Sequence, residues 1–233
     1  MNSLVIIPTY NEAENIDRLL TKILDQDVDI LFIDDSSKDA TAEKIKNWMK
    51  KSERINLIER LEKLGLGTAY ITGFKWALNK DYQFIFEMDA DLSHDPSEIP
   101  NFIKKCNEGY DLVIGSRYTR GTISVVGWDF RRLLLSKFAN KYAITILGLN
   151  FLTDITSGFR CYSRKVLENI KLDNIKSNGY AFQIEMAYRA YKAGFKIGEI
   201  PIIFYERNSG SSKMSKKIIS EAAIMVWRLR FGK

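Results

Sequence analysis

The chain has 233 residues, of which 45% are hydrophobic, and this length and composition indicate a globular protein with one large domain or two small ones. Its two cysteines, Cys106 and Cys161, exclude a disulfide framework and lack the close spacing of zinc ligands, so a reducing compartment is expected. The formal net charge of +6 is concentrated in residues 117–141 and 213–233, a distribution typical of proteins that bind phosphates, nucleic acid or an anionic membrane surface.

The N-terminus begins with an apolar run at residues 4–8 and shows neither a basic leader nor a cleavage site, so no secretory signal is expected. The longest apolar candidate, residues 142–152, is much shorter than the about 20 residues that span a bilayer. We therefore expect a cytoplasmic chain that does not cross a membrane.

The first half alternates short β-branched runs with helix-like stretches, which predicts βαβ units and a largely parallel sheet. The predicted strands are 3–8, 29–34, 55–59, 83–88 and 111–115. The predicted helices are 13–25, 40–51, 68–79 and 97–107, with Thr41, Thr68 and Ser97 as capping candidates.

The second half is less regular, with helices predicted near 130–147 and 180–193 and a strand near 197–205. No linker or repeat interrupts it, so we expect one continuous domain. Residues 216–233 carry apolar side chains at helical spacing between basic ends. Two interpretations of this last segment remain open: a helix docked on the core and a helix that lies in a membrane interface.

Acidic segments follow three of the predicted strands, at 8–12, 34–39 and 89–91. Because the carboxyl ends of parallel strands meet at one edge of a sheet, these segments should converge on one crevice. Asp89 and Asp91 end a buried strand and offer two hard oxygen donors, which suit Mg²⁺ or Mn²⁺. The Asp-x-Asp triplet alone is more typical of a solvated turn, and the neighbouring segments reverse this preference in favour of the metal site.

A glycine cradle for phosphates is missing, because Gly65 and Gly67 lack the third glycine of a dinucleotide-binding loop and there is no Walker motif. If a nucleotide binds, a metal and basic side chains must neutralise its phosphates. Asp91 and the basic cluster at 117–132 could do this.

The chain resembles the inverting glycosyltransferases of the GT-A fold, and among them most closely the dolichol-phosphate mannose synthases. The resemblance is carried by five ordered motifs: IIPTYNE at 6–12, IDDSS at 33–37, MDADLSH at 88–94, IGSRY at 114–118 and TSGFR at 156–160. It implies a mostly parallel central sheet flanked by helices. It also implies a catalytic domain at residues 1–213, followed by an amphipathic helix at 214–233.

The resemblance assigns roles to individual residues. GDP-mannose would be bound by Pro8, Tyr10, Glu12, Ile33, Asp35, Asp89, Ala90, Asp91, Arg117, Arg207 and Lys213. The acceptor phosphate would be bound by Arg117, Arg132 and Ser136, and the metal by Asp89 and Asp91. Catalysis would depend on Asp91, Arg117 and Arg132, and the acceptor-side loop would contain Asp154 and residues 157–160.

The expected activity is therefore metal-dependent transfer of mannose to a polyprenyl (dolichyl) phosphate with inversion, at the cytoplasmic face of a membrane. A phosphate acceptor is already anionic and needs no general base, whereas a hydroxyl acceptor would need a carboxylate such as Glu185 or Asp154. Many relatives continue into transmembrane helices, so this chain would reach its lipid through the terminal helix or a small membrane-anchoring subunit. Some relatives carry Gln at the position of Ser93, which makes Ser93 a weak metal candidate.

Three alternatives stay open. The first is a glycosyltransferase that uses another nucleotide sugar, such as UDP-glucose, with a polyprenyl phosphate or a glycan hydroxyl. The second is a non-catalytic scaffold that keeps the fold. Nucleic-acid binding is the third and is not expected, because no recognisable nucleic-acid motif accompanies the basic clusters.

Overall fold

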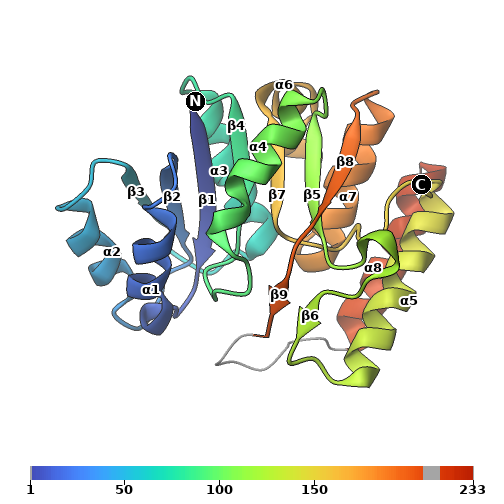
Figure 1. The fold of residues 1–233 in the computed structure, drawn as a ribbon, viewed down its shortest axis with the longest axis horizontal. Helices are drawn as coiled ribbons and strands as arrows, with labels where there is room; N and C mark the ends of the chain where they lie inside the picture. Colours follow the sequence, from blue (N-terminus) through green and yellow to red (C-terminus); the bar gives the residue numbers. More distant parts are fainter. Residues whose placement is uncertain (1, 207–215, 233) are drawn as a thin grey trace.

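A seven-stranded sheet forms the centre of the protein, in the order β3-β2-β1-β4-β7-β5-β8 (Figure 1). The computed structural model describes residues 2–206 and 216–232. The strands of this sheet are β1 (Ser3–Thr9), β2 (Asp29–Asp34), β3 (Ile55–Glu59), β4 (Phe84–Glu87), β5 (Leu112–Ser116), β7 (Arg160–Ser163) and β8 (Ile197–Pro201). Neighbouring strands are parallel except at β7, which runs antiparallel to β4 and β5. The carboxyl ends of β1, β2, β4 and β5 therefore share one edge.

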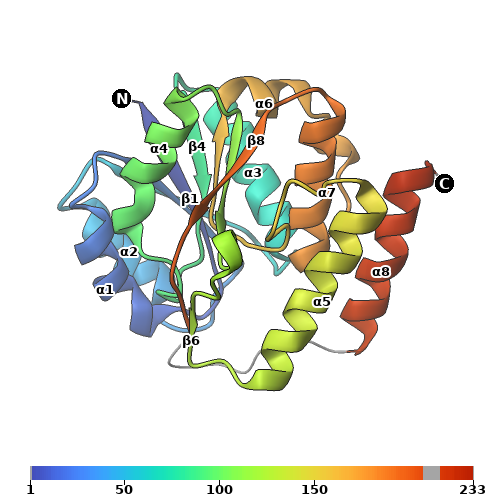
Figure 2. The same cartoon turned by 45° about the vertical axis from the view of Figure 1, so that its right-hand side comes forward.

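Helices cover both faces of the sheet (Figures 1 and 2). One face is covered by α1 (Ala13–Ile23), α2 (Thr41–Met49) and α4 (Ile99–Asn107). The other is covered by α3 (Leu66–Leu78), α5 (Phe130–Leu147), α6 (Arg164–Asn169), α7 (Gly179–Lys192) and α8 (Lys216–Phe231). Short 3-10 helices occur at Pro96–Glu98, Thr119–Gly121 and Leu172–Asn174. The result is the three-layer α/β/α arrangement that the alternating sequence pattern predicts.

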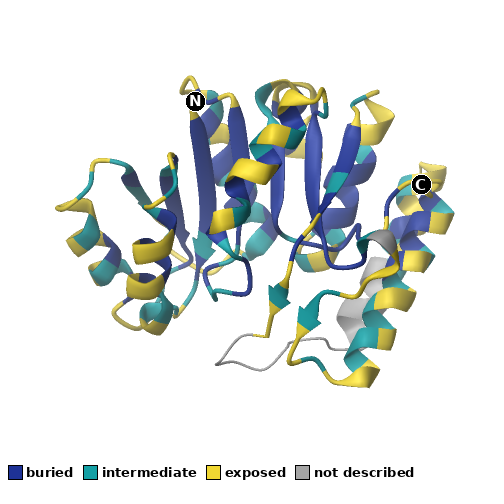
Figure 3. Cartoon of the chain, in the orientation of Figure 1, coloured by how far each residue is buried: buried dark blue, intermediate teal, exposed yellow. Residues whose placement is uncertain are grey.

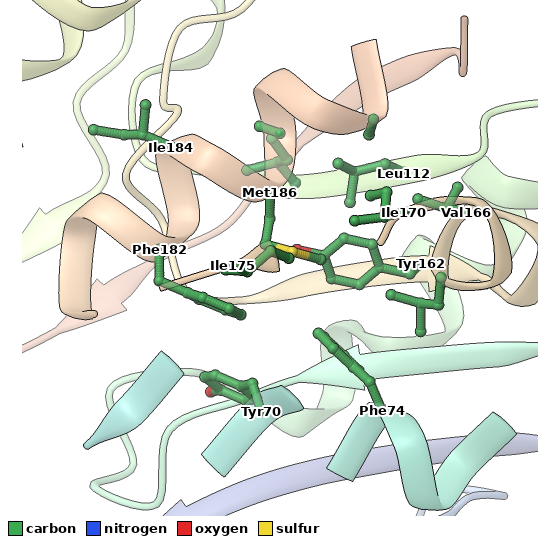
Figure 4. Packing of buried hydrophobic residues seen from close by; sticks show 14 of the residues in the cluster. Tyr70, Phe74, Leu112, Tyr162, Val166, Ile170, Ile175, Phe182, Ile184 and Met186 are labelled. Carbon is green, nitrogen blue, oxygen red and sulfur yellow. The ribbon is translucent and has the colours of Figure 1, made fainter. Parts of the chain in front are cut away.

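The strands are buried on both faces, as Figure 3 shows by their dark colour. Along β1, Leu4 and Ile6 pack into the core under α3, whereas Val5 and Ile7 pack under α1. This alternation follows from the two-residue period of a strand. In the cluster on the α3 side of the sheet, the Tyr70 ring stacks on that of Phe182 and the Phe74 ring meets that of Tyr162 edge-on (Figure 4).

The helices α5 and α8 lie side by side at one end of the sheet (Figure 2). The Asp129 carboxylate caps α5 by accepting the Arg132 backbone N–H at 2.9 Å, and a left-handed Gly148 ends it. On α8, Val226 is buried in the core, whereas Trp227 and Phe231 are exposed. The helix is thus docked through one side and leaves an apolar side uncovered. None of the helices within residues 2–206 and 216–232 is long and apolar enough to cross a bilayer.

The expected fold class is confirmed, and the five strands and four helices predicted in the first half lie within two or three residues of their observed bounds. The capping predictions are wrong. Thr41 begins α2 and its Oγ1 accepts the Glu12 N–H at 2.8 Å, while Thr68 lies inside α3. Ser97 does not cap but is capped, since its N–H donates to the Asp95 carboxylate.

Two further differences concern the second half. The strand predicted at 197–205 is two elements, because after Pro201 the chain leaves β5 and forms β9 (Phe204–Tyr205), which pairs with β6 (Val125–Val126) in a separate small sheet. The sequence analysis missed β7, whose four residues are too short and too polar to give a strand pattern. The expected domain boundary at 213–214 falls outside the described residues and stays a prediction.

Candidate active site

The loops after β1 and β2 are joined by the Asp34 carboxylate. Its Oδ1 accepts hydrogen bonds from Thr9 Oγ1 at 2.8 Å and Ser37 Oγ at 2.6 Å, and its Oδ2 accepts the Ser37 N–H at 2.9 Å. Asn11, with a φ of 58°, donates its N–H to Ser37 Oγ and accepts the Lys38 N–H. Asn adopts this left-handed conformation more readily than most residues, so the sequence suits the turn.

The predicted nucleotide-binding residues of the first half lie along this edge. Pro8 and Ile33 are directly paired between β1 and β2. Ile33 is fully buried in the core, backbone included, so it offers no exposed surface to a ligand and its predicted contact stays a prediction. Tyr10 is half-buried, and the Lys63 ammonium lies 3.4 Å from its ring centroid. Glu12 is the residue that precedes α1.

The Asp35 carboxylate is buried and already engaged within the protein. Arg60 Nε donates to its Oδ1 at 2.5 Å, and the Gly65 N–H donates to its Oδ2 at 3.0 Å. Arg60 also donates to Thr68 Oγ1 at 2.9 Å, so Asp35 holds residues 60–68 against β2. A ribose hydroxyl would have to share these oxygens. Sequence reasoning missed Arg60; the available signal was a basic residue directly after the strand that neighbours β2.

The Asp89-Ala90-Asp91 turn follows β4 at the same edge. The Asp91 Oδ1 accepts the Ser93 N–H at 3.0 Å, and Leu92 takes a left-handed φ of 62°. Both aspartates are half-buried, whereas Ala90 is buried. Because β4 pairs in parallel with β1, which pairs with β2, this turn lies at the same edge as the loops after β1 and β2, as the parallel-strand pattern predicts.

His94 packs behind this turn. Its ring centroid lies 5.2 Å from that of Phe159 and 5.5 Å from that of Phe204, and its Nδ1 accepts the Asp89 N–H at 3.4 Å. Burial lowers the pKa of His94 to about 4, so the imidazole is neutral at pH 7. The backbone of Gly158 also approaches closely, since a Cβ there would lie 3.7 Å from Asp89 Oδ2. The loop at residues 157–160 therefore lies directly against the Asp-x-Asp turn.

Arg117 lies just beyond β5 and forms a buried, two-pronged ion pair with Asp154. Its Nε and Nη2 donate to the two carboxylate oxygens at 2.6 and 2.7 Å, and its backbone N–H donates to Oδ2 at 3.0 Å. Nη2 also donates to Thr156 Oγ1 at 2.9 Å. Asp154 raises the pKa of Arg117 further above its ordinary value, which keeps the guanidinium charged.

Glu199 on β8 fixes the turn that carries Asp154. Its carboxylate accepts the backbone N–H groups of Thr153 and Asp154, both at 2.8 Å, and the Thr153 hydroxyl at 2.7 Å. Burial raises the pKa of Glu199, and these hydrogen bonds partly oppose that rise. The orientation of Arg117 therefore depends on a chain of contacts that runs back to the sheet.

Arg132 and Ser136 lie one turn apart on α5. The Arg132 Nη1 donates to Glu206 Oε1 at 2.6 Å, and its guanidinium carbon lies 4.3 Å from the centroid of the Trp128 ring. Ser136 Oγ accepts the Tyr118 hydroxyl at 2.8 Å. These two residues and Arg117 border one groove, so the predicted acceptor residues are brought together.

The groove lies between α5, α7 and α8, and its cavity volume is about 230 Å³. Arg117, Arg132, Ser136 and Thr156 supply polar groups to its lining. The rest of the lining is formed mainly by apolar and aromatic side chains: Trp128, Leu135, Phe138, Ala139, Tyr142, Ala143, Tyr180, Ile184, Ala223 and Val226. An apolar groove with cations at its border can hold an amphiphile with an anionic head.

The remaining predicted site residues lie outside the described residues or are engaged in packing. Arg207 and Lys213 lie outside the described residues. Glu185 is buried and paired with Arg189 on the next turn of α7, and it also accepts the Ser177 hydroxyl at 2.5 Å. Its carboxylate is thus part of the packing of α7.

Comparison with known proteins identifies the family. Residues 4–171 match the family described as Glycosyl transferase family 2, which is more than half of the chain. The chain belongs to this family. It is 44% identical to the polyprenol monophosphomannose synthase of Mycolicibacterium smegmatis, covering 98% of this chain and 87% of that protein. It is 42% identical to the undecaprenyl-phosphate mannosyltransferase of Micrococcus luteus, covering 98% and 93%.

Solved structures confirm the GT-A fold of this glycosyltransferase. The glucosyl-3-phosphoglycerate synthase of Mycobacterium tuberculosis, bound to Mn²⁺, UDP and glucosyl-3-phosphoglycerate, superposes with a TM-score of 0.72 at 17% identity, covering 99% of this chain and 80% of that one. A mannosyltransferase of Pyrobaculum calidifontis, bound to GDP-Man and Mn²⁺, superposes with a TM-score of 0.63 at 18% identity, covering 98% and 73%.

The carboxylate oxygens of Asp89 and Asp91 suit a hard divalent cation. Within residues 2–206 and 216–232 no group of three or more His, Cys, Asp or Glu side chains could enclose a metal. Two carboxylates leave coordination positions for water and for phosphate oxygens of a nucleotide, which is how Mg²⁺ is usually bound at phosphate-transfer sites. The residues present therefore fit a metal shared between protein and substrate.

Proposed function

We propose that this glycosyltransferase moves mannose from GDP-mannose to a polyprenyl phosphate, such as dolichyl phosphate, with inversion at the anomeric carbon. The observation that carries the proposal is the pair of arginines, Arg117 and Arg132, at the border of an apolar groove. The groove suits a prenyl chain and the arginines suit its phosphate. The names of the two bacterial relatives support the same sugar and the same class of acceptor.

The state of the carboxylates supports a phosphate rather than a hydroxyl acceptor. A hydroxyl nucleophile needs a general base, and Asp154 and Glu185 are the candidates. Asp154 is committed to Arg117, and Glu185 is committed to Arg189 and Ser177. A phosphate oxygen is anionic near neutral pH and needs positioning by cations instead.

The donor would lie along the carboxyl ends of β1, β2 and β4. Asp89 and Asp91 would hold Mg²⁺ or Mn²⁺, and the bound ion would neutralise charge on the departing diphosphate. Asp91, Arg117 and Arg132 would then be the residues on which turnover depends most. Nucleotide contacts from Pro8, Tyr10, Glu12, Ile33, Asp35, Ala90, Arg207 and Lys213 belong to the same proposal.

A lipid acceptor requires contact with a membrane, and the uncovered sides of α5 and α8 offer a surface for it. Exposed apolar side chains occur at four-residue spacing on α5 and beside the groove on α8: Phe130, Leu134, Phe138, Trp227 and Phe231. The exposed Lys137 and Lys141 add positive charge that suits an anionic leaflet. We therefore propose peripheral association with the cytoplasmic face of a membrane, through this surface or with a small anchoring subunit.

The experiment is a transfer assay with purified protein, Mn²⁺ and labelled nucleotide sugar in detergent. GDP-mannose with dolichyl or undecaprenyl phosphate should give a labelled lipid, whereas UDP-glucose, or a polyprenol without phosphate, should not. Arg132→Ala should raise the KM for the lipid phosphate, while Arg131→Ala, the exposed neighbour on the same helix, should not. Absence of labelled product with both lipid phosphates would refute the proposal. Transfer from UDP-glucose would show that the sugar donor is UDP-glucose and not GDP-mannose.

A further inference from the structure

The indole ring of Trp128 lies close to both arginines of the groove. The guanidinium carbon of Arg117 is 5.3 Å from its ring centroid and that of Arg132 is 4.3 Å away. Phe204 meets the same ring edge-on at 5.4 Å. Because a cation is attracted to the face of an indole, the ring positions both guanidinium groups, although they come from different elements of the fold.

The indole N–H of Trp128 is buried and has no hydrogen-bond partner among the described residues. Trp48 and Trp227, in contrast, donate to Asp17 and to the Tyr142 hydroxyl at 2.8 and 2.7 Å. Buried N–H groups are nearly always paired, and Trp128 is one of the residues that line the groove, so its unpaired donor points to a ligand that supplies the acceptor.

The donors left over on the arginines point to the same ligand. Arg117 uses Nε and Nη2 within the protein, and Arg132 uses Nη1 on Glu206. In the part of the chain that the structure describes, no hydrogen bond involves Nη1 of Arg117 or Nε and Nη2 of Arg132. Together with the indole nitrogen of Trp128, four donor nitrogens remain on these three residues, and the terminal oxygens of a phosphate monoester can accept hydrogen bonds from them.

We propose that Trp128 is an acceptor-binding residue: its N–H donates to a terminal oxygen of a phosphate monoester held between Arg117 and Arg132, and its ring positions both arginines. The ligand class is the phosphate head of a prenyl phosphate. This rests on the proposed function for its biological meaning, but the binding itself can be measured without transfer.

The test compares Trp128→Phe, which keeps an aromatic face and removes the N–H, with Trp128→Leu, which removes both. Trp76→Phe is the matched control, because Trp76 lies on α3 and packs against Tyr82, outside the groove lining. Farnesyl phosphate, farnesol and inorganic phosphate are titrated into the protein by calorimetry in the absence of any nucleotide sugar. Unfolding curves of all variants verify that they are folded.

We expect Trp128→Phe to weaken farnesyl phosphate binding about tenfold, Trp128→Leu to weaken it further, and Trp76→Phe to leave it unchanged. Farnesol should bind the wild type and Trp128→Phe equally. If Trp128→Phe also weakens the binding of inorganic phosphate, the groove holds a general phosphate site. If it weakens the binding of farnesyl phosphate alone, the site is specific for a lipid headgroup. Both outcomes support the assignment.

Equal farnesyl phosphate affinity for the wild type and Trp128→Phe, or an equal loss for farnesol, would overturn the inference. A transfer assay distinguishes failure of this assignment from failure of the proposed function. Where transfer occurs, Trp128→Phe should raise the KM for the lipid phosphate about tenfold and change that for GDP-mannose less than about twofold. If the wild type binds farnesyl phosphate through Trp128 but transfers no sugar, the proposed function fails and the binding assignment stands.

Discussion

Removal of the Asp154 carboxylate should be among the most destabilising single changes in the described structure. The Asp154 side chain is fully buried and the Arg117 side chain is 4% exposed. Asp154→Ala would leave the guanidinium buried without its counter-charge and would delete three hydrogen bonds that Arg117 donates, including the one from its backbone N–H. Breaking a buried ion pair in this way costs about 3–5 kcal/mol.

In a chain of 233 residues each kcal/mol lowers the unfolding midpoint by about 2–4 °C, so Asp154→Ala should lower it by about 6–20 °C. Asp154→Asn keeps one accepting oxygen and should lose less. Thermal and urea unfolding followed by circular dichroism measures both changes.

The control is Asp173→Ala, which removes an ion pair with Lys75 in which the Asp173 side chain is 82% exposed. Exposed pairs contribute about 0–1 kcal/mol, so this variant should unfold close to the wild type. If Asp154→Ala lowered the free energy of unfolding by less than about 1 kcal/mol, or Asp173→Ala by as much as Asp154→Ala, burial would not be what makes the Arg117–Asp154 pair important for stability.

Three further predictions follow from other parts of the molecule. Burial raises the pKa of Glu87 from 4.5 to about 7, so the folded protein keeps a proton that the unfolded chain loses, and stability falls as the pH rises through this window. In urea titrations, Glu87→Gln should therefore gain up to about 3 kcal/mol relative to the wild type between pH 4.5 and 7, and a constant difference would contradict this. Gly73→Ala places a Cβ 2.6 Å from Ile6 Cγ2, and the overpacking should cost about 1–3 kcal/mol of unfolding free energy; unchanged stability would show that the core can shift. Chelation by EDTA should abolish sugar transfer until Mn²⁺ is added back, and Asp91→Asn should lower turnover at least about 100-fold with an unchanged unfolding midpoint, whereas full activity in EDTA would exclude the metal.

The meeting of the acidic segments at one edge of the sheet could be predicted from the sequence because it follows from local patterns. Apolar runs at β1, β2 and β4 each end in polar residues, and the parallel arrangement follows from the helices between them. The positions of Asp35, Asp89 and Asp91 at one edge are thus implied before any coordinates are known. What remains invisible is the engagement of Asp35 by Arg60, which depends on β3 lying beside β2.

The acceptor side is harder to predict because its contacts join segments far apart in the chain. Arg117 meets Asp154 across 37 residues, and Arg132 meets Glu206 across 74. The strand that brings the acceptor-side loop to the Asp-x-Asp turn, β7, has no recognisable pattern of its own. The family resemblance pointed to Arg117 and Arg132, whereas Trp128 could be recognised only from the contacts in the structure.

The two arginines that we propose bind the acceptor differ in their exposure to solvent, and this difference bears on how an anion would bind. Asp154 and Arg117 are sealed from water, so their pairing is part of the fold and the ligand can use only the remaining edge of the guanidinium. The Glu206 and Arg132 side chains are 40% and 17% exposed, and a pair so open to solvent contributes little and exchanges easily. An incoming phosphate can therefore bind the nitrogens of Arg132 that Glu206 does not use, and the exposed Glu206 can adjust to it while the Arg117–Asp154 pair stays fixed. Binding of the proposed acceptor would then place an anion beside Arg132 without exposing any buried charge.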